Sequence, residues 1–127
     1  MDFDLTEEQV QLRDAARKLA QHEFRDKAAR WDRDETFPEE NKHRLAELGY
    51  LGLSVDKEFG GSGAGLVSTY LVIEELAKVD LLTAMIVHDQ NVSPRSIANH
   101  RPDDLKRRLV PRFVTADMIK PGATVID

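Results

Sequence analysis

Apolar residues return at helical intervals along most of this chain, and this feature restricts its fold more than any other. From Leu12 to Trp31 they recur mainly in steps of three or four residues, which gathers them on one face of an α-helix. Thr6 followed by Gln9 has the spacing of a capping box and predicts where this segment starts. We interpret it as one long amphipathic helix, or as two helices broken near residues 22–25.

Further helix starts are marked by residues that suit the first positions of a helix. Pro38 and Pro102 lack an N–H that would have no partner there, and Asp80 can cap a helix with its carboxylate. Pro94 is expected to end or kink the helix that Asp80 begins. The sequence therefore predicts an all-α fold, an up-down bundle of five or six helices.

A glycine-rich run interrupts the helical pattern in the middle of the chain. Four glycines between residues 60 and 65 cannot sustain a helix, so residues 50–65 are predicted to form a loop. The run could suggest a phosphate-binding loop, but it lacks the Lys-Ser/Thr of that motif, and no strong strand precedes it. We favour a turn between helices, with Gly60 or Gly61 at positive φ.

The charge and cysteine content exclude several classes of protein. The chain has 18 Lys and Arg against 23 Asp and Glu, a formal net charge of -5, whereas nucleic-acid binders usually show a basic face. It has no cysteine, so disulfide and thiolate chemistry are unavailable. No apolar stretch approaches the roughly 20 residues of a membrane helix, and no basic, then apolar, secretory signal follows Met1. These features predict a soluble, cytoplasmic domain that binds neither nucleic acid nor membrane.

The residues that could carry chemistry do not form a recognisable active site. The four histidines show no metal-binding spacing, so no metal site is predicted. Glu74 and Glu75 are neighbours on a helix and point about 100° apart, so they do not suit a shared site. Glu74 falls on the side of Tyr70 and Lys78, and we interpret it as a helix-face or structural carboxylate. These residues alone indicate a soluble helical domain without a visible active site.

A set of short motifs, in order along the chain, nevertheless resembles a known family. The set with its spacings is far more specific than any one of its members. It closely resembles the N-terminal helical domain of the acyl-CoA dehydrogenases over about residues 2–117. We therefore expect such a domain over residues 1–117 and an extended tail, the possible start of a barrel domain, over residues 118–127. The motifs are Leu5-Thr6-Glu7-Glu8-Gln9, Trp31-Asp32, Phe37-Pro38, Leu45-Ala46-Glu47-Leu48-Gly49, Glu58-Phe59-Gly60-Gly61, Glu74-Glu75-Leu76-Ala77 and Leu109-Val110-Pro111-Arg112-Phe113.

The resemblance implies a role in the α,β-dehydrogenation of acyl-CoA thioesters. In that family a carboxylate removes the α proton and FAD accepts a hydride. The base lies in a C-terminal helical domain, and most flavin contacts come from a middle β-barrel and a neighbouring subunit. The 127 residues contain neither segment. We expect FAD in the complete family enzyme, no cofactor on this chain alone, and no catalytic residue or activity in the isolated chain.

The resemblance also implies that this domain walls one side of the acyl pocket. Ala84, His88 and Val92 lie four residues apart, so one helical stripe could present them to the substrate. Apolar surface between residues 66 and 92 should also pack against other domains, against a second copy in a two-fold dimer, or against a partner chain that carries the barrel and C-terminal domains. Alternatively, the chain is a stand-alone helical interaction module, or the inactive subunit of a split enzyme. Self-association is expected to involve Tyr70, Ile73, Met85 or Val92.

Overall fold

A computed structural model describes residues 2–116, which form helices and connecting turns without any strand. The all-α prediction is therefore confirmed for this part of the chain. The tail predicted over residues 118–127 lies outside the described residues. The elements in chain order are α1 (Glu7–Leu19), η1 (Ala20–Phe24), α2 (Arg25–Asp34), α3 (Glu39–Glu47), η2 (Tyr50–Gly52), η3 (Lys57–Phe59), α4 (Gly65–Ala77), α5 (Leu81–His100) and α6 (Asp103–Val114).

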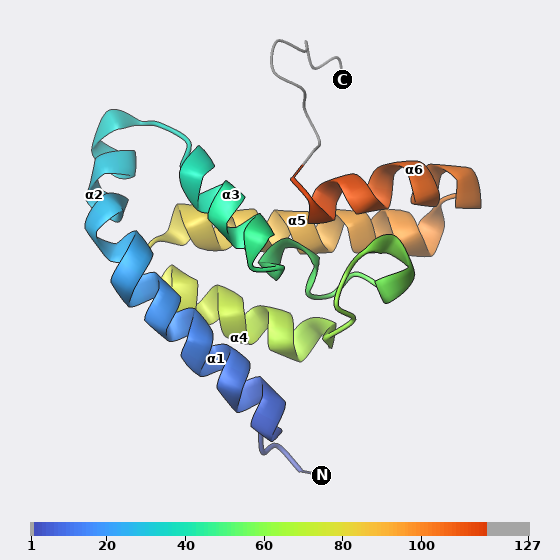
Figure 1. Cartoon of the computed structure of the whole chain (residues 1–127), viewed down its shortest axis with the longest axis horizontal. Helices are drawn as coiled ribbons and strands as arrows, with labels where there is room; N and C mark the ends of the chain where they lie inside the picture. Colours follow the sequence, from blue (N-terminus) through green and yellow to red (C-terminus); the bar gives the residue numbers. More distant parts are fainter. Residues whose placement is uncertain (1, 117–127) are drawn as a thin grey trace.

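The long helix α5 lies at the centre of the arrangement (Figure 1). It packs against α4 on one side and α6 on the other, while α1 packs against the far side of α4. The main core lies among these helices and the η2 turn. Phe24, Leu45 and Leu51 are among its largest fully buried side chains. Helix α1 thus supports α4, and helices α4 and α6 support α5.

The first helical segment begins as the sequence predicts and changes geometry near its middle. The Thr6 hydroxyl accepts from the backbone N–H of Gln9, and the Gln9 side chain accepts from the N–H of Thr6, which completes the capping box. The chain then passes through a π-helical turn, Ala20–Phe24, before α2. The predicted break near residues 22–25 is thus a wide turn in a continuous helical path (Figure 1).

Of the two outcomes predicted for Pro94, an end or a kink of its helix, the end is wrong. Helix α5 continues through Pro94 to His100. Pro94 cannot donate a backbone hydrogen bond, which destabilises the helix locally. However, Pro94 is buried, and α5 packs along its length against α4 and α6. Tertiary contacts offset the lost hydrogen bond, so the local signal fails here.

The glycine-rich loop is ordered by two short 3₁₀ turns and by close backbone contacts. Gly60 has φ of 91°, in the left-handed region, as the sequence predicts. Gly61 is required for a different reason, because a Cβ there would collide with the carbonyl oxygen of Val55. The loop closes through backbone hydrogen bonds such as Ser62 N–H to the Gly52 carbonyl (3.0 Å).

Candidate functional site

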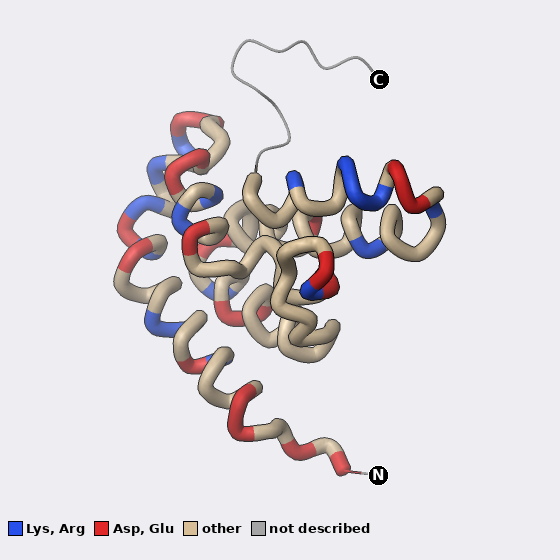
Figure 2. Tube along the Cα trace, turned by 45° about the vertical axis from the view of Figure 1, so that its right-hand side comes forward, with Lys and Arg blue, Asp and Glu red and all other residues tan. Residues whose placement is uncertain are grey.

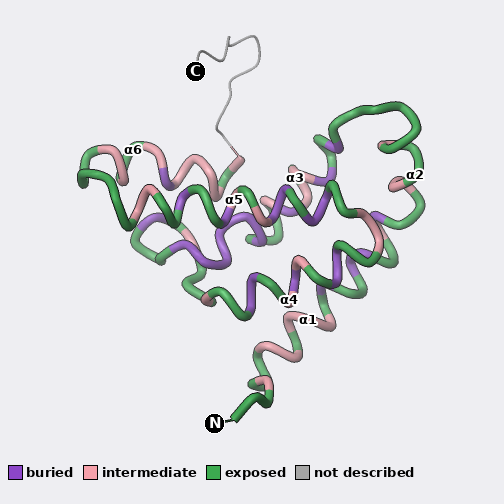
Figure 3. Tube along the Cα trace, turned by 180° about the vertical axis from the view of Figure 1, so that it is seen from behind, coloured by how far each residue is buried: buried purple, intermediate pink, exposed green. Residues whose placement is uncertain are grey.

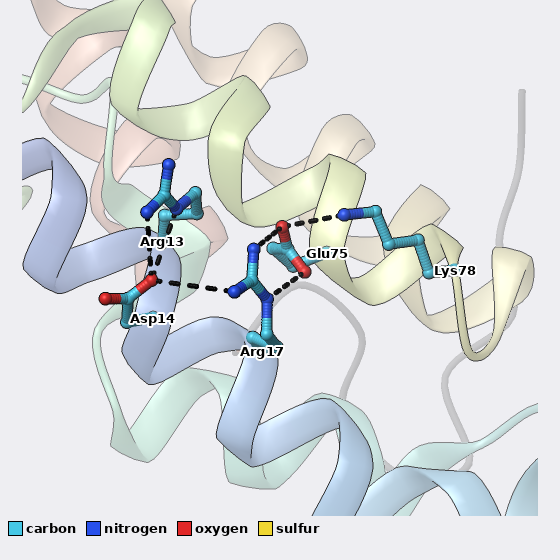
Figure 4. Close-up of polar contacts among 5 residues, drawn as sticks. All are labelled: Arg13, Asp14, Arg17, Glu75 and Lys78. Atoms are coloured by element: carbon cyan, nitrogen blue, oxygen red, sulfur yellow. Dashed lines mark hydrogen bonds and ion pairs between the residues drawn. The ribbon is translucent and has the colours of Figure 1, made fainter. Parts of the chain in front are cut away.

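A buried carboxylate fixes α4 against α1. Glu75 is 3% exposed, and its two oxygens accept hydrogen bonds from Nε and Nη2 of Arg17, both at 3.1 Å. Lys78 donates a third hydrogen bond at 2.9 Å. Asp14 holds Arg17 from the other side, and Arg13 in turn binds Asp14 (Figure 4).

The pKa of Glu75 is lowered to about 2, mainly by the hydrogen bond from Arg17 and also by Lys78, although burial opposes this. The carboxylate therefore stays ionised and ties the two helices together. The sequence led us to interpret Glu74 as a helix-face or structural carboxylate, and Glu74 is exposed on the face of α4. Glu75 has the structural role. The sequence could have indicated this, because Glu75 follows Val72 by three residues and therefore lies on the same, buried side of α4.

A second buried polar group fixes α5 against the glycine-rich loop. The Asn91 side chain, 1% exposed, accepts from the backbone N–H of Ser54 at 2.9 Å. It donates to the carbonyls of Tyr50 (3.0 Å) and Val87 (2.8 Å). Asn91 therefore fixes the middle of α5 in position, which determines which α5 side chains reach the surface.

The outer side of α4 and α5 carries exposed apolar side chains. On α4, Val67 and Tyr70 are 57% and 48% exposed; on α5, Met85 and Val92 are 41% and 38% exposed. The Tyr70 and His88 rings make an edge contact across the two helices, with centroids 6.3 Å apart. We call these five residues the α4–α5 face. Figure 3 shows exposed stretches along both helices beside their buried ones.

The three residues that the sequence predicts for the acyl pocket, Ala84, His88 and Val92, are not all exposed on one surface. Val92 is exposed and His88 is half-buried, so both reach the α4–α5 face. Ala84 is fully buried in the core beneath them. Met85 takes the neighbouring outward position, where it is exposed. Of the residues predicted for self-association, Tyr70, Met85 and Val92 are exposed and Ile73 is half-buried.

Charged side chains lie mostly away from this face. They are dense along α1, α2 and the start of α6 (Figure 2), whereas residues 81–88 contain none. Among residues 2–116 no group of three or more His, Cys, Asp or Glu side chains could hold a metal ion. No helix in that range is both long and apolar enough to cross a membrane.

A cavity of about 540 Å³ lies between α2 and the start of α5. Apolar side chains such as Trp31, Leu81 and Leu82 form most of its wall, together with the carboxylates of Asp32 and Asp80. No basic side chain lines it. A flavin dinucleotide carries a diphosphate, which requires basic groups or a free helix N-terminus. The N-terminus of α5 at this cavity is not free, because the Asp80 carboxylate accepts from the N–H of Leu82. This cavity does not fit FAD.

The described residues thus form a helical domain with a packed core and with exposed apolar side chains on α4 and α5. The family model described as "Acyl-CoA dehydrogenase, N-terminal domain" matches residues 6–117. The chain belongs to this family.

Individual relatives agree with this assignment. The chain is 36% identical over 113 residues to the acryloyl-CoA reductase (NADH) of Anaerotignum propionicum, a match that covers 89% of this chain and 29% of the relative. It is also 36% identical over 113 residues to the short-chain specific acyl-CoA dehydrogenase of Clostridium acetobutylicum, covering 87% of this chain and 30% of that protein.

Solved structures share the fold. The structure of a glutaryl-coenzyme A dehydrogenase in complex with glutaryl-CoA matches with a TM-score of 0.85 at 27% identity, covering 92% of this chain and 31% of that chain. The chain thus spans less than a third of the length of these relatives, in sequence and in structure.

Proposed function

We propose that this chain is the N-terminal domain of a flavin-dependent enzyme that dehydrogenates acyl-CoA thioesters. The observation that carries the proposal is the match of residues 6–117 to the domain of that family, together with the uncovered α4–α5 face. In the complete enzyme the middle and C-terminal domains supply the FAD site and the catalytic base. When bound, FAD accepts the hydride from the acyl group.

In this proposal the chain contributes walls and packing, with no catalytic residue of its own. Val92, Met85 and His88 form one side of the acyl pocket, with Ala84 beneath them. Their exposure supports this role, because side chains that line a pocket must be free of their own domain's core. The Glu75 and Asn91 contacts hold α4 and α5 in place, so the wall is rigid before substrate binds.

The second candidate is an interaction module without activity of its own, acting alone or as part of a split enzyme. The same apolar face favours it, since several exposed apolar side chains on one surface are typical of protein interfaces. In this case the face contacts a second copy or a partner chain that carries the barrel and C-terminal domains.

A chimera tests the first candidate directly. The matching part of the Clostridium acetobutylicum short-chain acyl-CoA dehydrogenase is replaced by this chain, and acyl-CoA-dependent reduction of an artificial electron acceptor is measured. We expect a flavin-containing, active chimera. Met85→Lys should reduce activity strongly, because it places a charge in the pocket wall or the domain interface.

The matched control is Phe3→Lys, which makes the same kind of change at a side chain that is 84% exposed on the arm before α1. This variant should keep the activity of the chimera. A chimera that folds and binds FAD but does not oxidise acyl-CoA would argue for the interaction module. Equal activity of the two lysine variants would show that the α4–α5 face does not form the pocket.

A further inference from the structure

The chain separates its charges along the sequence. Residues 2–94 contain 11 Lys and Arg against 19 Asp and Glu, whereas residues 95–112 contain six Lys and Arg against two Asp and Glu. The second range covers the end of α5 and most of α6, and Figure 2 shows its basic positions along α6. A local surplus of four positive charges in a chain with a net charge of -5 favours the binding of an acidic partner at this end of the fold.

Most of these cations have no acidic partner within the part of the chain that the structure describes. In residues 2–94, seven of the 11 Lys and Arg side chains form ion pairs. In residues 95–112, Lys106 forms an ion pair with Asp103 at 3.5 Å. The side chains of four exposed arginines form no ion pair or hydrogen bond with any residue in 2–116, namely Arg95, Arg101, Arg107 and Arg108. Their charges are therefore available to another molecule.

Acidic side chains next to this segment are too few to balance it. Asp56 lines a hollow with Arg95, and Asp56 and Glu58 line a second hollow with Arg107. Neither carboxylate forms an ion pair among residues 2–116. Lys57, between them in the sequence, offsets one of their two charges. When these three residues are included, a surplus of three positive charges remains.

The helix dipoles account for only some of the basic residues. A cation near the C-terminus of a helix is stabilised by the dipole, which explains Arg101 at the C-cap of α5 and Arg112 in the last turn of α6. Arg95, Arg107 and Arg108 lie further inside their helices. Arg107 and Arg108 also repel each other, because neighbouring like charges raise the energy of the folded chain. A bound acidic group would remove this repulsion.

Helix α6 adds apolar side chains beside its arginines. Leu105, Leu109 and Phe113 recur every four residues, so they lie on one side of α6. All three are half-buried, and none belongs to the two clusters of core residues. Arg108 follows Leu105 by three residues, and Arg112 follows Leu109 by three, which places the arginines along the adjoining side. The helix thus presents a row of partly exposed apolar side chains next to a row of arginines.

We propose that this α6 surface, formed by Leu105, Arg108, Leu109, Arg112 and Phe113, binds an amphipathic acidic helix of another protein. The apolar row would contact the apolar side of that helix, and the arginines would bind its Asp and Glu side chains. A nucleic acid fits less well, because it would leave the apolar row unused and meet the acidic remainder of the chain. The inference goes beyond the proposed function and does not depend on it.

A synthetic peptide tests this surface on the full chain. The probe is a fluorescein-labelled helix of Ala, Leu and Glu, with Leu along one side and Glu beside it, and binding is followed by fluorescence anisotropy. At about 50 mM NaCl we expect a Kd on the order of 10 µM. About 500 mM NaCl should weaken binding about tenfold, because salt screens exposed charges. A scrambled peptide of the same composition should bind about fivefold more weakly, since it has no apolar side.

Three variants locate the binding surface. Arg108→Glu should weaken peptide binding by about fivefold. The matched control is Lys18→Glu on α1, which also reverses an exposed charge that forms no ion pair among residues 2–116 and gives the same net charge; it should weaken binding less than about twofold. Leu105→Gln should weaken binding about threefold. Far-ultraviolet circular dichroism checks its fold, and the scrambled peptide tests the apolar row independently.

The other outcomes overturn the proposal. No binding of the helical peptide at about 50 mM NaCl would exclude the α6 surface as a site for such a helix. Equal binding of the helical and scrambled peptides would show that charge alone attracts them. Equal losses in Arg108→Glu and Lys18→Glu would place the effect in the net charge. Tighter binding of single-stranded oligothymidylate would assign the surface to nucleic acid, and self-association at low salt that Arg108→Glu abolishes would assign it to the acidic half of a second copy.

Discussion

Replacing Glu75 by Gln should destabilise the fold in a way that depends on pH. The folded pKa of about 2 lies below the ordinary value of 4.5, so the ionised carboxylate stabilises the folded state. This contribution is complete above about pH 4.5 and is lost as the pH falls from there to about 2. The difference in pKa corresponds to at most about 3–4 kcal/mol.

Solvent reduces that figure, because the side chains of Arg17 and Lys78 are 50% and 52% exposed and water screens their charges. We expect Glu75→Gln to lower the free energy of unfolding by about 1–2 kcal/mol near pH 7. Near pH 3 the gap between this variant and the wild type should shrink to about half.

Urea unfolding followed by far-ultraviolet circular dichroism at both pH values measures the effect. Glu74→Gln is the matched control, since the neighbouring carboxylate is exposed and its loss should change stability by less than about 0.5 kcal/mol. The reasoning is refuted if Glu75→Gln matches the control near pH 7. It is also refuted if the gap to the wild type is the same at both pH values.

Three further outcomes are expected. Gly60→Val should lower the free energy of unfolding by about 1 kcal/mol or more, because Gly60 has a positive φ, and Gly61→Ala should also lower it, because the new Cβ would collide with the Val55 carbonyl. Thermal unfolding of both variants at the wild-type midpoint would contradict this. The purified chain with added FAD and acyl-CoA should not reduce an artificial electron acceptor, and turnover in protein from a host without related enzymes would count against it. Sedimentation at micromolar concentration should show a dimer that Met85→Lys weakens and Phe3→Lys does not, whereas a monomer at all concentrations would exclude this interface.

The sequence determined the features that depend on neighbouring residues. The capping box at Thr6, the cap at Asp80 and a positive φ at Gly60 or Gly61, found at Gly60, each rest on contacts or steric limits within a few residues. The order of helices and the family follow from the same kind of local pattern. Such features do not need the rest of the chain, so spacing and residue type were sufficient to predict them.

The tertiary structure decided which side of each helix faces inward. Helix α5 has apolar side chains on several sides, and helical spacing alone cannot say that Ala84 is buried while Met85 is exposed. Pro94 remains helical because α4 and α6 hold α5 on both sides. Spacing could place Glu75 on the inward side of α4, but its partner Arg17 lies 58 residues away in sequence and reaches the carboxylate only in the packed structure. Each of these outcomes depends on the free energy of contacts between distant segments, which exists only once the helices have packed together.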